Sequence, residues 1–182
     1  MPDHKTIPLR SEIPEAYTWN TADLYPTDDA WHTDAQLLRT QIDTLGSYAG
    51  RLGSGADTLY DYVTLEQEAG ERLSKLLDYA QRKSDEDTRV DTYQAMVGKA
   101  MSLYVDFLRA TAFETPEVLS IPEEQLEAFY AQKPELTLYR RYFHNIQRRR
   151  AHTLSDAEER LLAAAGDMAQ APDDIFSKLT DA

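Results

Sequence analysis

The chain has 182 residues, of which 42% are hydrophobic and 28% are charged, and its 19 Lys and Arg against 32 Asp and Glu give a formal net charge of −13. This length and apolar content predict one globular domain and exclude disordered or low-complexity chains. The absence of cysteine excludes a disulfide scaffold, a thiolate zinc site and a cysteine nucleophile. Apolar runs are far shorter than a membrane span, and residues 1–10 lack a signal-peptide core, which predicts a soluble, cytoplasmic protein.

The charge is unevenly distributed along the chain. Residues 140–152 contain no acidic residue and hold five arginines, namely Arg140, Arg141, Arg148, Arg149 and Arg150. One interpretation is an anion or RNA site. We favour a helix face that pairs with carboxylates of its own or a neighbouring domain, because arginine binds carboxylates through two parallel hydrogen bonds. The acidity of the rest of the chain predicts no nucleic-acid and no membrane partner.

Residues 1–26 contain four of the eight prolines and no helical period, which predicts an extended arm. Its aromatic residues Tyr17, Trp19 and Tyr25 are too many for a solvated tail, so we expect the arm to lie against the body and bury them. The first helix is predicted to begin near Asp28. Its apolar residues recur at alternating intervals of four and three, at Trp31, Ala35, Leu38, Ile42, Leu45, Ala49 and Leu52.

Two further long helices are predicted. The second runs from about residue 57 to 84, and Gly70 and Glu66 weaken its middle, which leaves a kink open there. The third follows a polar turn at 84–88, and its predicted buried residues are Tyr93, Met96, Val97, Ala100, Met101, Tyr104, Val105 and Leu108.

Shorter helical pieces follow, opened by Pro116, Pro122, Pro134 and a capping box at 155–158, with a last piece at 173–179. No stretch alternates in the manner of a strand. The predicted fold is all-α, with an N-terminal extended arm followed by long antiparallel helices and several shorter helices. We expect residues 1–26 to form the arm packed on the body and residues 27–182 to form a helical N-terminal domain, truncated before a catalytic domain.

The residues form no recognisable catalytic constellation. His-Glu-x-x-His, Glu-x-x-His, Gly-x-Ser-x-Gly and the phosphate-binding loop are all absent. Asp28, Asp29 and His32 could share one helical turn as a metal site, but acids at a helix N-terminus beside an exposed histidine are the commoner case. From the residues alone we therefore expect no catalytic, metal-binding or cofactor-binding residue in this chain.

Several segments, in order along nearly the whole chain, carry a family resemblance. Residues 113–126 read Phe-x-x-Pro-Glu-x-Leu-x-Ile-Pro-Glu-Glu-x-Leu, and residues 152–163 read His-Thr-Leu-Ser-x-x-Glu-Glu-x-Leu-Leu-Ala. The other segments are 10–19, 23–26, 134–139 and 171–179. Together they resemble the N-terminal part of oligoendopeptidase F, of the thimet-type zinc metallo-oligopeptidase family.

The resemblance implies a longer, mostly helical metalloprotease whose deep channel holds zinc, bound by His-Glu-x-x-His and a further glutamate, and which hydrolyses short peptides by metal-activated water. None of those residues has a counterpart here, so this chain is expected to form the channel wall and to be inactive alone. Its implied partners are the missing C-terminal catalytic domain and short peptide substrates. Candidate interdomain packing residues are Ile175, Phe176, Leu179, Arg148, Arg149 and Arg150.

Two alternatives stay open. The first is a standalone helical protein-interaction module without enzyme activity. The second, disfavoured by charge, is an RNA-binding helical protein that uses the arginines at 148–150.

Overall fold

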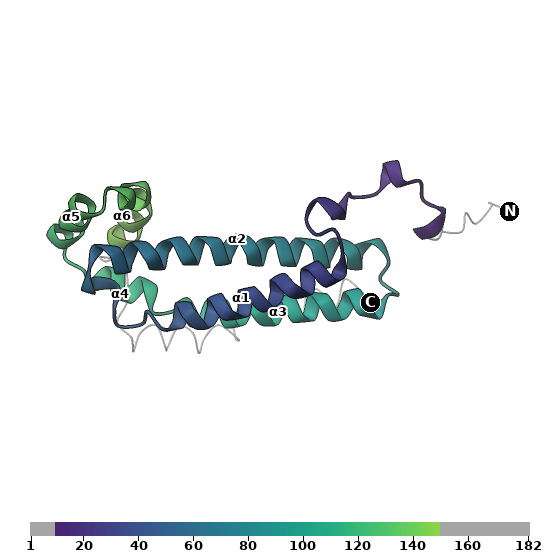
Figure 1. Cartoon of the computed structure of the whole chain (residues 1–182), viewed down its shortest axis with the longest axis horizontal. Helices are drawn as coiled ribbons and strands as arrows, with labels where there is room; N and C mark the ends of the chain where they lie inside the picture. The colour runs from purple at the N-terminus through teal and green to yellow at the C-terminus, as the bar shows by residue number, and fades with distance from the viewer. Residues whose placement is uncertain (1–9, 150–182) are drawn as a thin grey trace, which may run out of the picture. The chain divides into compact units, whose positions relative to one another are not determined.

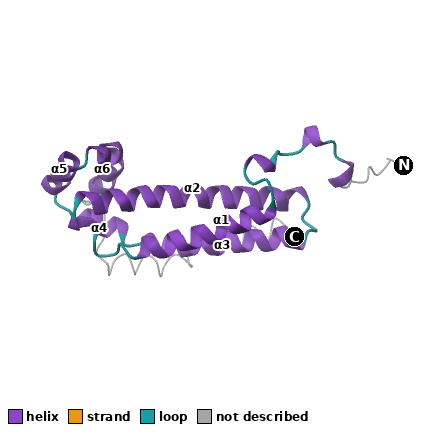
Figure 2. Cartoon of the chain, in the orientation of Figure 1, coloured by secondary structure: helices purple, strands orange, loops and turns teal. Residues whose placement is uncertain are grey.

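A computed structural model describes residues 10–149, and in that range it contains helices and no strand (Figure 2). The long helices are α1 (Asp28–Gly46), α2 (Ala56–Glu86) and α3 (Asp91–Thr111), followed by α4 (Glu114–Ser120), α5 (Glu123–Gln132) and α6 (Arg140–Arg148). Short 3₁₀ helices occur at Arg10–Glu12, Glu15–Tyr17, Thr21–Asp23, Leu52–Ser54 and Pro134–Tyr139. The all-α prediction is confirmed.

The chain divides into two compact units, residues 1–140 and residues 141–182. The first unit holds α1 to α5. The described part of the second unit consists of α6 beyond Arg140, in which Phe143 and Ile146 are buried. The predicted division at residue 26 stays a prediction.

Helices α1, α2 and α3 lie side by side, and each contacts the other two (Figure 1). The apolar stripe predicted for α1 is buried from Trp31 to Leu45. Ala49 is exposed because α1 ends at Gly46 and the chain then turns, with Gly50 at a φ of +78°. Such a left-handed conformation favours glycine, so the turn that closes α1 is encoded at that position.

Helix α2 runs through Gly70 without interruption. A Cβ at Gly70 would lie 4.0 Å from the ring of Phe107 on α3, so this position faces the neighbouring helix. We expected glycine to weaken the helix here, but packing against α3 keeps Gly70 helical. In a long buried helix, such packing outweighs the low helix propensity of glycine.

The buried stripe predicted for α3 is half wrong. Met96 and Ala100 are buried, together with Leu103 and Phe107, which the prediction omitted. The predicted positions Met101, Tyr104, Val105 and Leu108 are exposed. Successive residues of a helix turn by about 100°, so the eight predicted positions form two adjoining stripes. In the described chain α1 and α2 cover one of these stripes, and the other faces outward.

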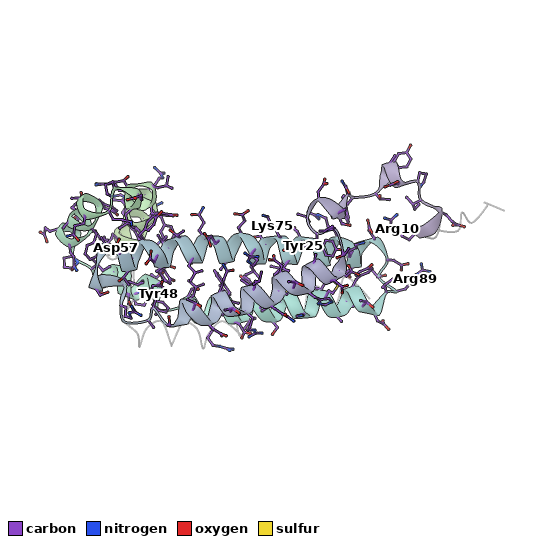
Figure 3. The ribbon with its side chains drawn as sticks, in the orientation of Figure 1. Arg10, Tyr25, Tyr48, Asp57, Lys75 and Arg89 are labelled. Atoms are coloured by element: carbon purple, nitrogen blue, oxygen red, sulfur yellow. The ribbon has the colours of Figure 1, made fainter. Side chains whose placement is uncertain are left out.

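The prediction for the arm aromatics holds for one residue of three. Tyr25 is 7% exposed, packs edge-on against Tyr79 and lies at the start of α1 (Figure 3). Trp19 is 51% exposed, with the Arg82 guanidinium over its ring, and Tyr17 is 83% exposed. Burial of Tyr17 and Trp19 was therefore a wrong expectation, and the contact of Trp19 with α2 is a cation–π contact at the surface.

Hydrogen bonds connect the loop after α1 to α4 and α5. The Glu117 carboxylate accepts hydrogen bonds from the backbone N–H groups of Gly50 and Leu52, the latter at 3.1 Å. The Gln125 amide donates to the Gly53 carbonyl at 2.9 Å, and Ile121 is buried beside Gly53. The residues of the family-like segment 113–126 therefore serve the fold, by fixing the α1–α2 connection.

We expect Glu117→Ala to lower the free energy of unfolding by about 2 kcal/mol, because hydrogen bonds to a charged acceptor are worth more than neutral ones. Chemical denaturation followed by circular dichroism measures the change. Glu124→Ala is the matched control, since Glu124 is exposed on α5. Equal stability of the two variants would show that the Glu117 contacts contribute nothing.

Candidate functional site

A polar network joins the arm to the long helices. The Tyr25 hydroxyl donates to the Asp34 carboxylate at 2.6 Å, and the Arg72 guanidinium forms an ion pair with the same carboxylate. Arg72 also donates to Gln41 at 2.9 Å. Burial and then the bond to Asp34 raise the pKa of Tyr25 far above its usual value, so the hydroxyl stays protonated and acts as a donor. The network positions the arm.

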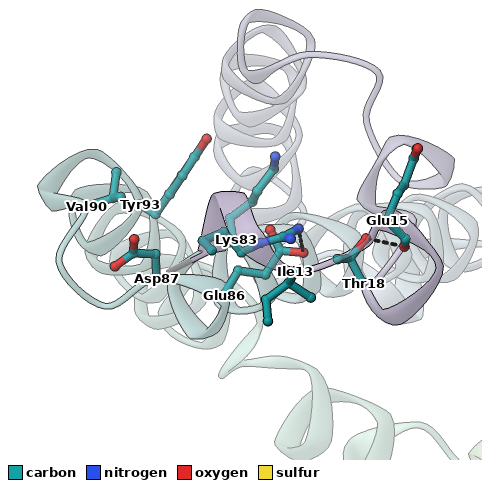
Figure 4. A pocket seen from close by; sticks show the side chains of 9 residues that line it. Ile13, Glu15, Thr18, Lys83, Glu86, Asp87, Val90 and Tyr93 are labelled. Atoms are coloured by element: carbon teal, nitrogen blue, oxygen red, sulfur yellow. Dashed lines mark hydrogen bonds and ion pairs between the residues drawn. The ribbon is translucent and has the colours of Figure 1, made fainter. Parts of the chain in front are cut away.

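The arm and the α2–α3 turn also line an open cleft of about 460 Å³ (Figure 4). A volume of this size is typical of small-molecule sites. The cleft is lined by Arg10, Ile13, Glu15, Thr18, Lys83, Glu86, Asp87, Val90 and Tyr93. It is the candidate binding site of the described chain, and it draws residues from the arm, from α2 and from α3.

The charged groups of the cleft are largely paired. Arg10 and Glu86 form an ion pair at 2.9 Å across it. The Arg89 side chain and backbone N–H donate to Asp87 and hold the pKa of that carboxyl at about 2. The Lys83 ammonium lies 5.4 Å from the centre of the Tyr93 ring, a cation–π contact. Carboxylates held in ion pairs are poor general bases near neutral pH, so Glu86 and Asp87 are poor candidates for acid–base catalysis.

A second unusual carboxyl lies elsewhere on α2. Burial, and to a lesser degree the charge of Glu114, raise the pKa of Glu66 to about 7. Glu114 is itself buried at the start of α4. A carboxyl with such a pKa can be a functional acid or base. Among the described residues no group of three metal-binding side chains includes it, and we interpret the two carboxyls as a pH-sensitive point of the fold.

The Asp28, Asp29 and His32 metal hypothesis is not supported. Asp28 accepts a hydrogen bond from the Tyr79 hydroxyl at 2.7 Å, and His32 lies edge-on to Trp31 with its Nδ1 3.4 Å from the Lys99 ammonium. Across residues 10–149, no three His, Asp or Glu side chains are grouped as a metal site requires. The described residues therefore do not fit a zinc ion.

The predicted interdomain packing residues fall at the edge of the described chain. Arg148 ends α6, and it and Arg149 are exposed. Arg150, Ile175, Phe176 and Leu179 lie outside the described residues. The common role of these six residues therefore stays a prediction. In the same range, 10–149, no helix is long and apolar enough to cross a membrane.

The comparisons with known proteins point to one family. Residues 117–182 match the model of the family described as Oligopeptidase F. Oligopeptidase PepF of Bacillus subtilis is 39% identical over 176 residues, which cover 97% of this chain and 26% of that protein. The plasmid-encoded oligoendopeptidase F of Lactococcus lactis subsp. cremoris is 33% identical, over 92% of this chain and 28% of its own.

Solved structures agree with the sequence matches. The crystal structure of oligoendopeptidase-F from Enterococcus faecium aligns with a TM-score of 0.64 and 29% identity, over 84% of this chain and 29% of that chain. A putative peptidase from Chlamydophila abortus aligns with a TM-score of 0.75 and 25% identity, over 97% of this chain and 30% of its own.

The helical fold and these comparisons together show that the chain is related to the N-terminal part of a peptidase family. That family is oligopeptidase F, also named oligoendopeptidase F, as the motifs predicted. The chain spans about a quarter of the length of the curated relatives that it matches.

Proposed function

We propose that this chain is the N-terminal, channel-wall domain of a cytoplasmic zinc metalloendopeptidase that resembles oligoendopeptidase F and hydrolyses short peptides. The observation that carries the proposal is the 39% identity to Oligopeptidase PepF across 97% of this chain but only 26% of that protein. A chain that aligns with one quarter of a peptidase, without a group of metal ligands among its described residues, is suited to a supporting role.

Zinc would supply an activated water in the complete enzyme. The described residues do not fit the metal, so its ligands are proposed to belong to the polypeptide beyond this quarter. What the present residues contribute is rigidity. Three long helices share one core, and ion pairs such as Arg39–Asp106, at 2.6 Å, link α1 to α3. A rigid helical wall beside a channel limits the size of the substrate that can enter.

The proposal predicts an activity difference between two proteins. The full-length product of the source gene should cleave a quenched fluorescent peptide of about eight residues and lose that activity on chelation, because metal removal takes away the activated water. The present chain alone should show no cleavage above buffer. Cleavage by the present chain, or a full-length product that is inactive with added zinc, would contradict the proposal.

A standalone interaction module is the second candidate, favoured by the exposed apolar side of α3. The same assay separates the two candidates. An interaction module would show no peptidase activity at any length of the gene product.

A further inference from the structure

Most charges of the cleft between the arm and the α2–α3 turn are matched by a neighbour. Arg10 and Glu86 form an ion pair at 2.9 Å. Asp87 pairs at 2.7 Å with Arg89, which is not itself a lining residue. Each of these pairs is neutral as a whole, so neither favours a ligand of one sign over a ligand of the other.

Two further charges of opposite sign line the cleft, and neither has an ion-pair partner among residues 10–149. One is the Lys83 ammonium on α2, and the other is the carboxylate of Glu15, an exposed residue of the arm. Figure 4 shows Lys83 next to Tyr93, with Glu15 further away beyond Thr18. The cleft therefore has a positive end and a negative end.

The positive end carries two hydrogen-bond donors. The Lys83 ammonium lies 5.7 Å from the centre of the Tyr79 ring and 5.4 Å from that of Tyr93. These cation–π contacts orient the ammonium but provide no hydrogen-bond acceptor of full charge. The Tyr93 hydroxyl forms no hydrogen bond within the described part of the chain, and the two side chains point the same way in Figure 4. A charged and a neutral donor together suit a carboxylate.

The charge of the whole chain limits which ligand can use this site. The net charge of −13 repels a ligand that is only anionic, and the Lys83 ammonium repels one that is only cationic. A molecule with one charge of each sign has no net charge and can satisfy both ends. The volume of about 460 Å³ is in the range of small-molecule sites.

We propose that the cleft binds a small zwitterion with a free ammonium and a free carboxylate, the chemistry shared by free amino acids and short peptides. Its carboxylate accepts hydrogen bonds from the Lys83 ammonium and the Tyr93 hydroxyl, and its ammonium donates to Glu15. The aliphatic lining residues Ile13 and Val90 contact its apolar part. The inference is independent of the proposed function, since every residue that it uses belongs to this chain.

The test titrates the isotope-labelled 182-residue chain with trialanine at low ionic strength and follows the amide NMR signals of Val90 and Tyr93. Trialanine amide lacks the free carboxylate, and N-acetyl-trialanine lacks the free ammonium. We expect each derivative to bind about tenfold more weakly than trialanine, because each loses a charge-assisted hydrogen bond. Free alanine identifies the source of the ligand: it binds at least as tightly as trialanine at an amino-acid site and more weakly at a peptide site.

Two variants assign the two charges separately. In Lys83→Met the amide should bind as well as trialanine, whereas the N-acetyl derivative should still bind more weakly. In Glu15→Gln the pattern should be reversed. Lys75→Met is the matched control, because Lys75 lies on the same helix outside the cleft and pairs with Glu71, and it should keep both differences.

Equal binding of the three peptides by the parent chain would overturn the inference, and so would unchanged signals of Val90 and Tyr93. The parent's preferences retained in both Lys83→Met and Glu15→Gln would overturn it as well. Glu15→Gln changes an exposed residue of the arm, so its result stands whatever Lys83→Met does to the stability of α2.

Discussion

Replacing Trp31 by alanine should lower the free energy of unfolding by about 4 kcal/mol, the cost of removing a large aromatic side chain from a packed core. Trp31 is fully buried on α1, and its indole N–H donates to the Leu76 carbonyl of α2 at 2.9 Å. The substitution therefore removes core volume and a link between two helices. Urea denaturation followed by circular dichroism at 222 nm measures the loss.

Trp19→Ala is the matched control for this experiment. Trp19 is 51% exposed, and its ring contacts the Arg82 guanidinium in a cation–π arrangement. Removing that contact should cost under about 1 kcal/mol. If Trp31→Ala destabilises the protein no more than Trp19→Ala does, then Trp31 is not at the centre of the core.

A second large effect is expected at Glu66, as a dependence of stability on pH. Burial raises the pKa of this carboxyl from its usual 4.5 to about 7 in the folded protein. The folded state therefore binds a proton that the unfolded state has lost between these values, so stability falls as the pH rises from 4.5 to 7 and then levels off. Allowing for the part of the carboxyl still in contact with water, the loss is about 2 kcal/mol.

Glu66→Gln should remove that dependence and stabilise the protein at pH 8 by a similar amount, because an amide cannot ionise. Thermal unfolding between pH 5 and pH 8 provides the measurement. Glu68→Gln, at an exposed position of the same helix, is the control and should leave the pH profile of the parent protein unchanged. Identical profiles for Glu66→Gln and the parent would contradict the account of this carboxyl.

The sequence predicted the buried residues best where the apolar residues of a helix recur on one side only. The stripe of α1 is narrow, and its positions from Trp31 to Leu45 are buried as predicted. In α3 the apolar residues occupy more than one side, and a pattern of residue types cannot say which side has a neighbour. Leu103 and Phe107 were missed for that reason, and the side of α3 that carries Met101, Tyr104, Val105 and Leu108 was mistaken for core.

The polar features depend on residues far apart in the chain, which no local pattern connects. Glu117 was recognised as part of a motif, but its backbone partners Gly50 and Leu52 lie 67 and 65 residues away. Glu66 was taken as a weak point in a helix, because its burial beside Glu114 follows only from tertiary packing. The cleft at the arm gathers residues from three segments, of which 10–19 was recognised as a family-like segment and 84–88 as a polar turn. Neither pattern predicts that the two segments meet.

The central claim is that this chain is the N-terminal part of a longer zinc peptidase. Sequencing the source gene beyond the codon for Ala182 tests it most directly. The account predicts that the reading frame continues and encodes His-Glu-x-x-His on one helix, with a further glutamate on the next. A stop codon directly after the codon for Ala182 would contradict the claim and leave the standalone helical module as the remaining candidate.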